Sequence, residues 1–245
     1  MAKEGEITRV IQKARQVLSE GKFDEALRDL LHLSEKYPEA GEIRPPIAEV
    51  LIRRGKVRVG KGKIREGLND FERSLNWAVL PEAYVQLGRA LVEQGELDRA
   101  HELYTKAIEL DDRFGPAYEA LGNLLLKWNE YGEAAKTFEQ SLSFNHATPE
   151  LYLAVWHTYM TLENLDRAHT LLMEGADRFP THDRLRAAVG DSFVYAKGDS
   201  EGAEPHWRRA VEINPSNFSA LFSLAGLEAS RGGRREALEW LGRCV

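Results

Sequence analysis

The most constraining feature of the sequence is a repeat of about 34 residues that runs through nearly all of it. Residues 81–114 (PEAYVQLGRALVEQGELDRAHELYTKAIELDDRF) and residues 115–148 (GPAYEALGNLLLKWNEYGEAAKTFEQSLSFNHAT) are two copies in register. One small residue recurs in every copy, at intervals of 33 to 35 residues after a first gap of 41: Ala26, Gly67, Ala100, Ala134, Ala168, Ala203 and Ala237. A period of this length predicts stacked helical or mixed units, each burying the apolar face of its neighbour, without long-range strand pairing.

The repeated residues resemble the tetratricopeptide repeat family, whose unit is a helix, a tight turn and a second helix. The resemblance covers residues 7–245 when Pro81 is taken as the first place of its unit. Its motifs are the large fourth residue, the Leu-Gly pair at places seven and eight, the aromatic at place twenty-four and the closing proline, here Tyr84, Tyr118, Tyr152, Leu87-Gly88, Leu121-Gly122, Phe71, Tyr104, Phe138, Trp207, Pro38, Pro180 and Pro215. The resemblance implies an all-α fold, a right-handed superhelical solenoid of about seven such repeats.

The repeat also sets the expected domain organisation. We expect a disordered N-terminus at residues 1–6 and a solenoid over residues 7–245. The expected repeats are 7–40, 48–80, 81–114, 115–148, 149–182, 183–217 and 218–245. The joint at 41–47 contains Pro45 and Pro46, which remove two backbone donors. The last repeat is expected to stop at Val245 inside its second helix, without a polar capping helix. Either the sequence is cut from a longer protein or a partner covers this end, and self-association through it is an alternative.

Two local features concern the packing inside the repeats. Glycines recur where the first helix of a repeat must end, and there we expect the left-handed conformation of a helix C-cap: Gly21, Gly62, Gly95, Gly198 and Gly232. Trp156 stands at the eighth place, where close helix packing favours a small residue. Either it creates an aberrant groove together with His157, Tyr159 and Met160, or a neighbouring gap accommodates the ring.

Members of the family bind partners in a concave groove, into which the second, fifth, sixth, ninth, twelfth and thirteenth places project. The resemblance therefore implies a groove for a peptide or an amphipathic helix with apolar anchors. The residues at the ninth places change from basic to acidic along the chain, which places an acidic end of the partner near repeats one to three. The implied groove residues are Lys56, Val85, Arg89, Val92, Glu119, Asn123, Leu126, Lys127, Leu153, His157, Met160, Asp191 and Tyr195.

Some members grip the C-terminal carboxylate of heat-shock chaperones through lysines, arginines and asparagines at fixed groove places. The best corresponding set here is Ile52, Lys56, Gln86, Pro116 and Ala120. Because this clamp is missing, we do not predict binding to chaperone tails.

A basic run offers a second, separate contact. Seven basic side chains and no acidic one occur between residues 53 and 65, and the candidates for binding an acidic ligand are Arg53, Arg54, Lys56, Arg58, Lys61, Lys63 and Arg65. The alternative is a solvated helix face with extended basic side chains, which we favour because no aromatic residues interleave the charges to stack on nucleic acid bases.

No catalytic or metal-binding motif occurs in the sequence. It has no nucleophile elbow, no Cys-His pair and no close pair of histidines, so we predict neither an enzyme nor a cofactor or metal site. The charged start MAKEGEITRV lacks the apolar segment of a secretory signal, and no run approaches the roughly 18 apolar residues of a membrane span. The single cysteine excludes an internal disulfide. These observations predict a cytoplasmic protein without membrane insertion.

The sequence therefore predicts a protein–protein interaction scaffold or adaptor that binds a peptide segment or helix in its concave groove. One alternative is the regulatory arm of a larger enzyme. Another, less favoured, is a binder of RNA or an acidic ligand through the basic run at 53–65.

Overall fold

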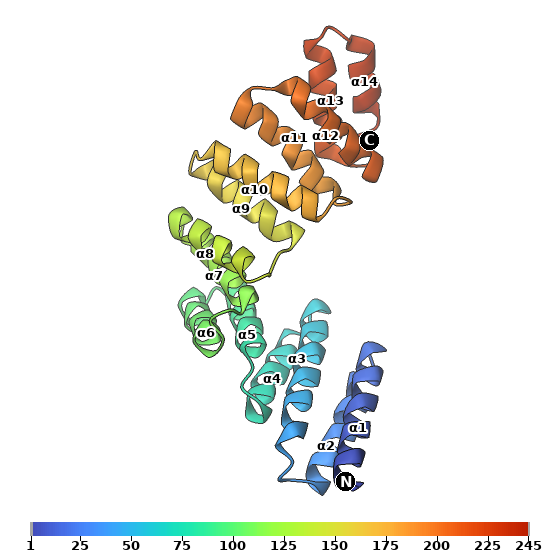
Figure 1. Ribbon diagram of the computed structural model, residues 1–245, viewed down its shortest axis with the longest axis vertical. Coiled ribbons are helices and arrows are strands. Elements are labelled where there is room, and N and C mark those ends of the chain that lie inside the picture. The colour runs from blue at the N-terminus through green and yellow to red at the C-terminus, as the bar shows by residue number, and fades with distance from the viewer. Residues whose placement is uncertain (1, 245) are drawn as a thin grey trace. The chain divides into compact units, whose positions relative to one another are not determined.

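The computed structural model describes residues 2–244, and every regular element in that range is helical. Fourteen α-helices and one short 3₁₀ helix occur among these residues, and consecutive α-helices form seven antiparallel pairs (Figure 1). This confirms the predicted all-α array of about seven helix pairs. The contacts divide the chain into two compact units, Met1–Leu124 and Leu125–Val245.

The first unit contains the helix pairs of the first three repeats. Its elements are α1 (Ala2–Ser19), α2 (Phe23–Lys36), η1 (Gly41–Ile43), α3 (Arg44–Gly60), α4 (Ile64–Trp77), α5 (Pro81–Glu93), α6 (Leu97–Leu110) and most of α7 (Gly115–Lys127). Each helix packs against the next in the chain from α1 to α6, so neighbouring pairs share a continuous core.

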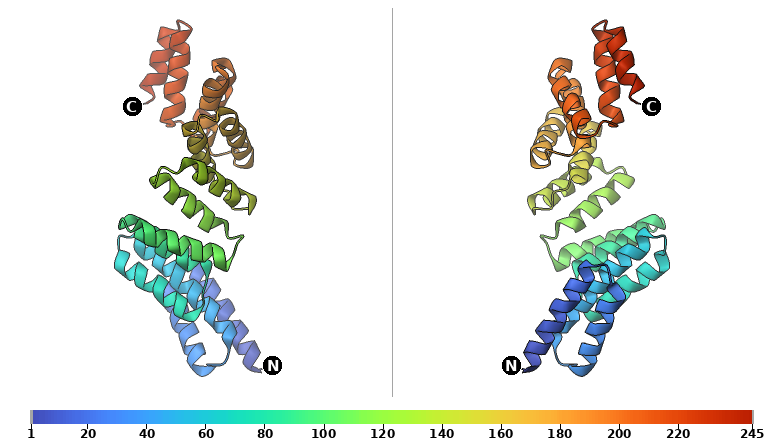
Figure 2. Two further views of the ribbon diagram at one scale, coloured as in Figure 1. Left: turned by 90° about the vertical axis from the view of Figure 1, so that its left-hand side faces the viewer. Right: turned by 90° about the vertical axis from the view of Figure 1, so that its right-hand side faces the viewer.

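The second unit contains the end of α7 and the helices that follow it. Its helices are α8 (Tyr131–Ser143), α9 (Pro149–Thr161), α10 (Leu165–Arg178), α11 (Asp183–Lys197), α12 (Ser200–Ile213), α13 (Phe218–Ser230) and α14 (Arg234–Gly242). In addition to the sequential contacts, the first helices of neighbouring repeats touch, α9 with α11 and α11 with α13 (Figure 2). The first helices α9, α11 and α13 therefore form one continuous wall within this unit, which we call the inner wall.

The joint between the first two repeats is anchored by two buried side chains. Ile43 in η1 and Ile47 in α3 are both fully inaccessible, and they belong to the core that α1, α2 and α3 share. Pro45 and Pro46 lie in the first turn of α3, where a helix leaves its N–H groups unpaired and proline costs no hydrogen bond. The two prolines therefore begin a helix here.

Both ends of the described chain differ from expectation. Residues 2–6 form the start of α1 rather than a disordered segment, because the Glu6 carboxylate accepts hydrogen bonds from Lys36 Nζ at 2.6 Å and from the Tyr37 hydroxyl at 2.7 Å. Met1 and Val245 lie outside the described residues. Helix α14 ends at Gly242, so the last described residues lie beyond the second helix of the seventh repeat rather than inside it.

The predicted left-handed turns are confirmed at all five glycines. Their φ angles lie between 65° and 82°, where a side chain would strain the backbone. Asn129 and Glu163 take the same conformation, with φ of 62° and 57°, at the corresponding place of the fourth and fifth repeats. The turn is thus kept even in repeats that lack the glycine.

Helix pairing within a repeat depends on a small residue that faces an aromatic ring. A Cβ atom placed on Gly88 of α5 would lie 2.4 Å from the Tyr104 ring of α6, and one on Gly190 of α11 would lie 2.5 Å from the Trp207 ring of α12. In both repeats the glycine is on the first helix and the ring is on the second. The close approach explains why this place favours a small residue.

None of the helices within residues 2–244 has the length and apolar character that crossing a membrane requires.

Two histidines enclose one phenylalanine ring between α10, α11 and α12. The Phe193 ring stacks on His206, with centroids 5.1 Å apart, and meets the edge of His169 at 4.8 Å. His169 Nδ1 lies 2.8 Å from Ser192 Oγ, whose own proton goes to the Val189 carbonyl. Burial lowers the pKa of both histidines, and the positive charges of Lys197 near His169 and Arg186 near His206 lower it further.

We therefore expect this part of the protein to lose stability in mild acid. A histidine whose native pKa lies below its unfolded value leaves stability intact above the unfolded pKa of about 6.5 and reduces it as the pH falls below that value. Urea unfolding at pH 7.5 and at pH 5 should show a larger loss for the wild type than for His169→Gln/His206→Gln. Equal losses would contradict this prediction.

Candidate inner-wall site

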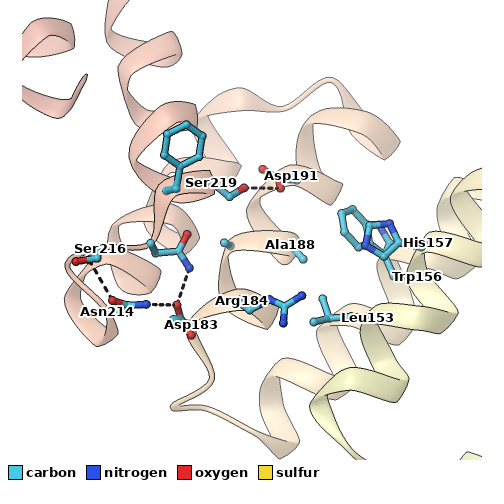
Figure 3. Close-up of a pocket in the computed structure, with 13 residues that line it drawn as sticks. Leu153, Trp156, His157, Asp183, Arg184, Ala188, Asp191, Asn214, Ser216 and Ser219 are labelled. Atoms are coloured by element: carbon cyan, nitrogen blue, oxygen red, sulfur yellow. Dashed lines mark hydrogen bonds between the residues drawn. The ribbon is translucent and has the colours of Figure 1, made fainter. Parts of the chain in front are cut away.

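A cavity of about 520 Å³ lies on the inner wall of the second unit, between α9, α11 and the start of α13. Its size is within the range of binding sites for small ligands and single side chains. Figure 3 shows its lining residues, which are Leu153, Trp156, His157, Asp183, Arg184, Ala187, Ala188, Asp191, Asn214, Ser216, Asn217, Phe218 and Ser219.

Trp156 reaches this wall because the fifth repeat reverses the usual small-to-aromatic pairing. Here the ring is Tyr152 on the first helix, and the glycine is Gly175 on the second, where an added Cβ would lie 2.6 Å from Tyr152 Cγ. With the close contact moved to another turn, the eighth place can hold Trp156, which is only 8% exposed. The ring is therefore accommodated by the packing and also lines the cavity, so both predicted alternatives are partly correct.

The wall formed by α11 and α13 carries two carboxylates that the protein itself satisfies. Asp183 accepts hydrogen bonds from Asn214 Nδ2 at 2.7 Å and Asn217 Nδ2 at 2.8 Å (Figure 3). Burial opposes ionisation of Asp183, but the bonds from these two amides, together with the backbone N–H of Arg184 and the nearby His182, lower the pKa of the carboxyl. The residue therefore stays charged at neutral pH.

The second carboxylate, Asp191, is held from both neighbouring elements. Its Oδ1 accepts a hydrogen bond from Trp207 Nε1 at 2.9 Å and a longer one from Ser223 at 3.3 Å, and Oδ2 lies 3.5 Å from the Ser219 hydroxyl. Burial raises the pKa of Asp191, whereas these donors lower it, and burial dominates.

The opposite side of the cavity is formed by α9 together with Arg184. The His157 ring packs against the Trp156 ring, with centroids 4.5 Å apart. Burial lowers the pKa of His157, and the nearby Arg184 guanidinium lowers it further, so the imidazole is neutral at pH 7. Figure 3 shows the Arg184 side chain extending from α11 toward Leu153 of α9.

Exposed aromatic rings continue the cavity along the same wall. Phe218 and Phe222, one helical turn apart on α13, are 63% and 60% exposed, and their rings stack with centroids 6.1 Å apart. Tyr195 of α11 is 61% exposed. Large apolar side chains left this accessible at the edge of a cavity with a mixed polar and apolar lining are typical of an interaction surface.

The predicted groove residues have different positions in the structure. Leu153, His157 and Asp191 line the large cavity, whereas Lys56 and Arg89 line a cavity of about 260 Å³ between α3 and α5 in the first unit. Val85 is fully buried and cannot reach a ligand without unfolding. The others are half-buried or exposed: Val92, Glu119, Leu126 and Met160 half-buried, and Asn123, Lys127 and Tyr195 exposed.

The prediction missed several residues of the large cavity. Arg184 and Ser219 each occupy the second place of a repeat, one of the places that project into the groove in this family, and that signal could have found them. Phe218 occupies the first place of the seventh repeat and Asn214 lies near the end of the sixth, outside the places that project into the groove, so neither could be found from the repeat pattern.

Most of the basic run at residues 53–65 is paired within the first unit. Arg54 is buried and donates to Asp70 at 2.6 and 2.9 Å and to Asp24 at 2.5 Å. Further pairs are Arg58 with Asp70 and Glu66, Lys56 with Glu82, Arg53 with Glu49 and Lys63 with Glu66. These pairs match most of the charge, which leaves Lys61 and Arg65 for the predicted acidic ligand.

Two further features bear on the remaining expectations. Within residues 2–244 no group of three or more His, Cys, Asp or Glu side chains could hold a metal ion. On α14, Leu238 and Leu241 are 60% and 40% exposed, and self-association through this helix stays a prediction.

Comparison with known proteins identifies the repeat. Two family models, each described as tetratricopeptide repeat, match residues 81–114 and 115–146. The solved C-terminal part of a tetratricopeptide repeat protein from Cytophaga hutchinsonii is 13% identical and has a TM-score of 0.65, with 96% of this chain and 93% of that chain covered. The chain is a tetratricopeptide repeat protein.

Two other similarities concern proteins with described roles. Anaphase-promoting complex subunit 7 of Arabidopsis thaliana is 25% identical over 162 residues, which are 66% of this tetratricopeptide repeat chain and 29% of that relative. The solved structure of YrrB, described as a TPR protein with an unusual peptide-binding site, is 24% identical, covers 66% of this chain and 83% of that one, and has a TM-score of 0.55. The chain thus spans less than a third of the curated relative's length.

Proposed function

We propose that this tetratricopeptide repeat protein is a scaffold or adaptor that holds a peptide segment or helix of a partner protein against the inner wall of the second unit. The single observation that carries the proposal is the 520 Å³ cavity between α9, α11 and α13. A partner side chain can enter it, while the neighbouring backbone lies along α11 and α13.

The chemistry of this wall supports a protein partner. Apolar anchors can contact Leu153 and the exposed rings of Phe218 and Phe222, and polar groups at the cavity can fix the orientation of a chain. The described role of YrrB as a peptide binder and the place of the plant relative in a multisubunit complex are consistent with this proposal.

The alternatives rest on weaker observations. A regulatory arm of a larger enzyme would use the same wall, so it differs only in what the partner is. RNA or acidic-ligand binding through residues 53–65 is less favoured because most of those charges are already paired. A cytoplasmic location stays a prediction.

Two exposed rings provide the test. We expect Phe218→Asp/Phe222→Asp to abolish recovery of the partner from an extract of the native cells, because it places two charges where apolar anchors would bind. Each side chain is more than half exposed, so folding should be retained.

The matched control is Leu238→Asp, since Leu238 is also 60% exposed in this unit but lies on α14. The recovered proteins are compared by mass spectrometry. The proposal fails if the double variant recovers the same partners as the wild type while circular dichroism reports an unchanged helix content.

A further inference from the structure

The two sides of the cavity on the inner wall differ in their unused hydrogen-bonding groups. On the side of α11 and α13 the polar groups are used within the protein: Asp183 by two amides, and Asp191 by Trp207 and two serines. The side-chain oxygens of Asn214 and Asn217 accept from the backbone N–H of Ser216 and Ala220, at 3.1 and 2.9 Å. Both amides donate to Oδ2 of Asp183, so the acceptors on this side are partly used within the protein.

The side formed by α9 and Arg184 has donors without acceptors. Trp156 is only 8% exposed, and its Nε1 has no hydrogen-bond partner among the described residues. A buried donor without an acceptor is costly, and its presence beside a cavity suggests that something else supplies the acceptor. Arg184 is exposed at the same cavity and forms no ion pair with any residue in the described range.

We propose that this cavity receives an acidic side chain, Asp or Glu, of the bound segment, with Arg184 as its charge partner. The inference rests on the proposed function and adds the chemistry of the group that is recognised. An arginine fork matches the two oxygens of a carboxylate, and the indole N–H of Trp156 is a further donor within the same cavity. The Trp156 N–H is inaccessible in this conformation, so it would meet a ligand only after a shift of neighbouring side chains such as the exposed His157 ring, whose centroid lies 4.5 Å from that of the indole.

Asp183 also lines the cavity and stays charged, because the amides that donate to it are neutral. The acidic group is therefore placed on the side of α9 and Arg184, where the Arg184 charge favours a carboxylate over an ammonium or guanidinium group. The recognised acid would lie at repeats five and six. The residues at the ninth places, considered alone, place the acidic end of the partner near repeats one to three. Arg184 lies at a second place and was therefore missed.

The test uses the full chain and, as the probe, random peptides displayed on phage. Selection is carried out on the wild type, and the selected peptides are then synthesised both as C-terminal amides and with a free C-terminal carboxyl group, each with and without its acidic residue replaced by Gln or Asn. Binding of each peptide is measured by fluorescence anisotropy to the wild type, to Arg184→Gln, to Trp156→Phe and to Phe218→Asp/Phe222→Asp. Arg209→Gln is the matched control, because Arg209 is exposed on α12, outside the cavity, and pairs with Glu212.

We expect the selected peptides to share an acidic residue whose neutralisation weakens binding to the wild type about tenfold, the usual contribution of one charge-assisted contact. The same peptide change should have little effect on Arg184→Gln, and Arg209→Gln should behave as the wild type. Trp156→Phe should weaken the acidic peptide more than its neutral copy.

Three results would overturn the inference. Peptides that bind in a Phe218-dependent way, yet are indifferent to both the acid and Arg184, would refute the acidic group and leave the proposed function standing. Binding that requires a free C-terminal carboxylate would refute the assignment to a side chain. If the library yields no peptide whose binding depends on Phe218 and Phe222, both the inference and the proposed function fail.

Discussion

Replacing Asp70 by alanine is expected to lower the free energy of unfolding of the first unit by about 3–5 kcal/mol, the usual cost of removing one partner from a buried ion pair. Asp70 is 1% exposed and accepts hydrogen bonds from both Arg54 and Arg58. Its carboxylate raises the pKa of the Arg54 guanidinium. Without it, that buried cation keeps only Asp24, which is itself exposed.

The matched control is Asp29→Ala, because Asp29 forms a surface pair with Lys13 at 2.6 Å in the same unit. An exposed pair of this kind contributes at most about 1 kcal/mol. Urea unfolding followed by circular dichroism measures both variants. A loss for Asp70→Ala no larger than that for Asp29→Ala would contradict the assignment of the basic run to internal pairing.

The second large effect concerns the reversed pairing in the fifth repeat. We expect Gly175→Ala to destabilise the second unit by about 1–3 kcal/mol, because the new methyl group would overlap Tyr152 at the base of its ring, which cannot swing aside. The cost should shrink in a Tyr152→Leu background, where the ring atoms are absent.

Gly226→Ala is the matched control, since Gly226 lies in α13 with no heavy atom within 4 Å of an added Cβ. At such a helical position alanine should stabilise by roughly 0.5–1 kcal/mol relative to glycine. The two changes thus have opposite expected signs. Thermal unfolding midpoints that move in the same direction would argue against the close contact between α9 and α10.

The fold could be predicted well because small and large residues recur at fixed spacing in each repeat. Gly88 and Tyr104 recur in phase with their counterparts, and the turn glycines at 21, 62, 95, 198 and 232 all adopt the predicted left-handed conformation. A solenoid depends on contacts between neighbours in the chain, so local patterns carry most of the information.

The site was less predictable because it depends on side chains from three different repeats. Leu153, His157 and Asp191 were found from their places in the repeat, but only the structure shows that Arg184 lines the cavity and forms no ion pair within residues 2–244. Val85 shows the opposite error, since its place projects into the groove in the family but its side chain is fully buried here. How Trp156 is accommodated at the eighth place could be seen only in the structure, because the compensating Gly175 lies nineteen positions later in the sequence.

Site-specific photo-crosslinking in the native cells tests the central claim most directly. A photoreactive phenylalanine analogue replaces His157 at the cavity or, in a second variant, Arg209 on α12; both positions are exposed. We predict a covalent adduct with a partner protein from position 157 and none from position 209. An adduct from position 209 together with none from position 157 would contradict binding at the inner wall.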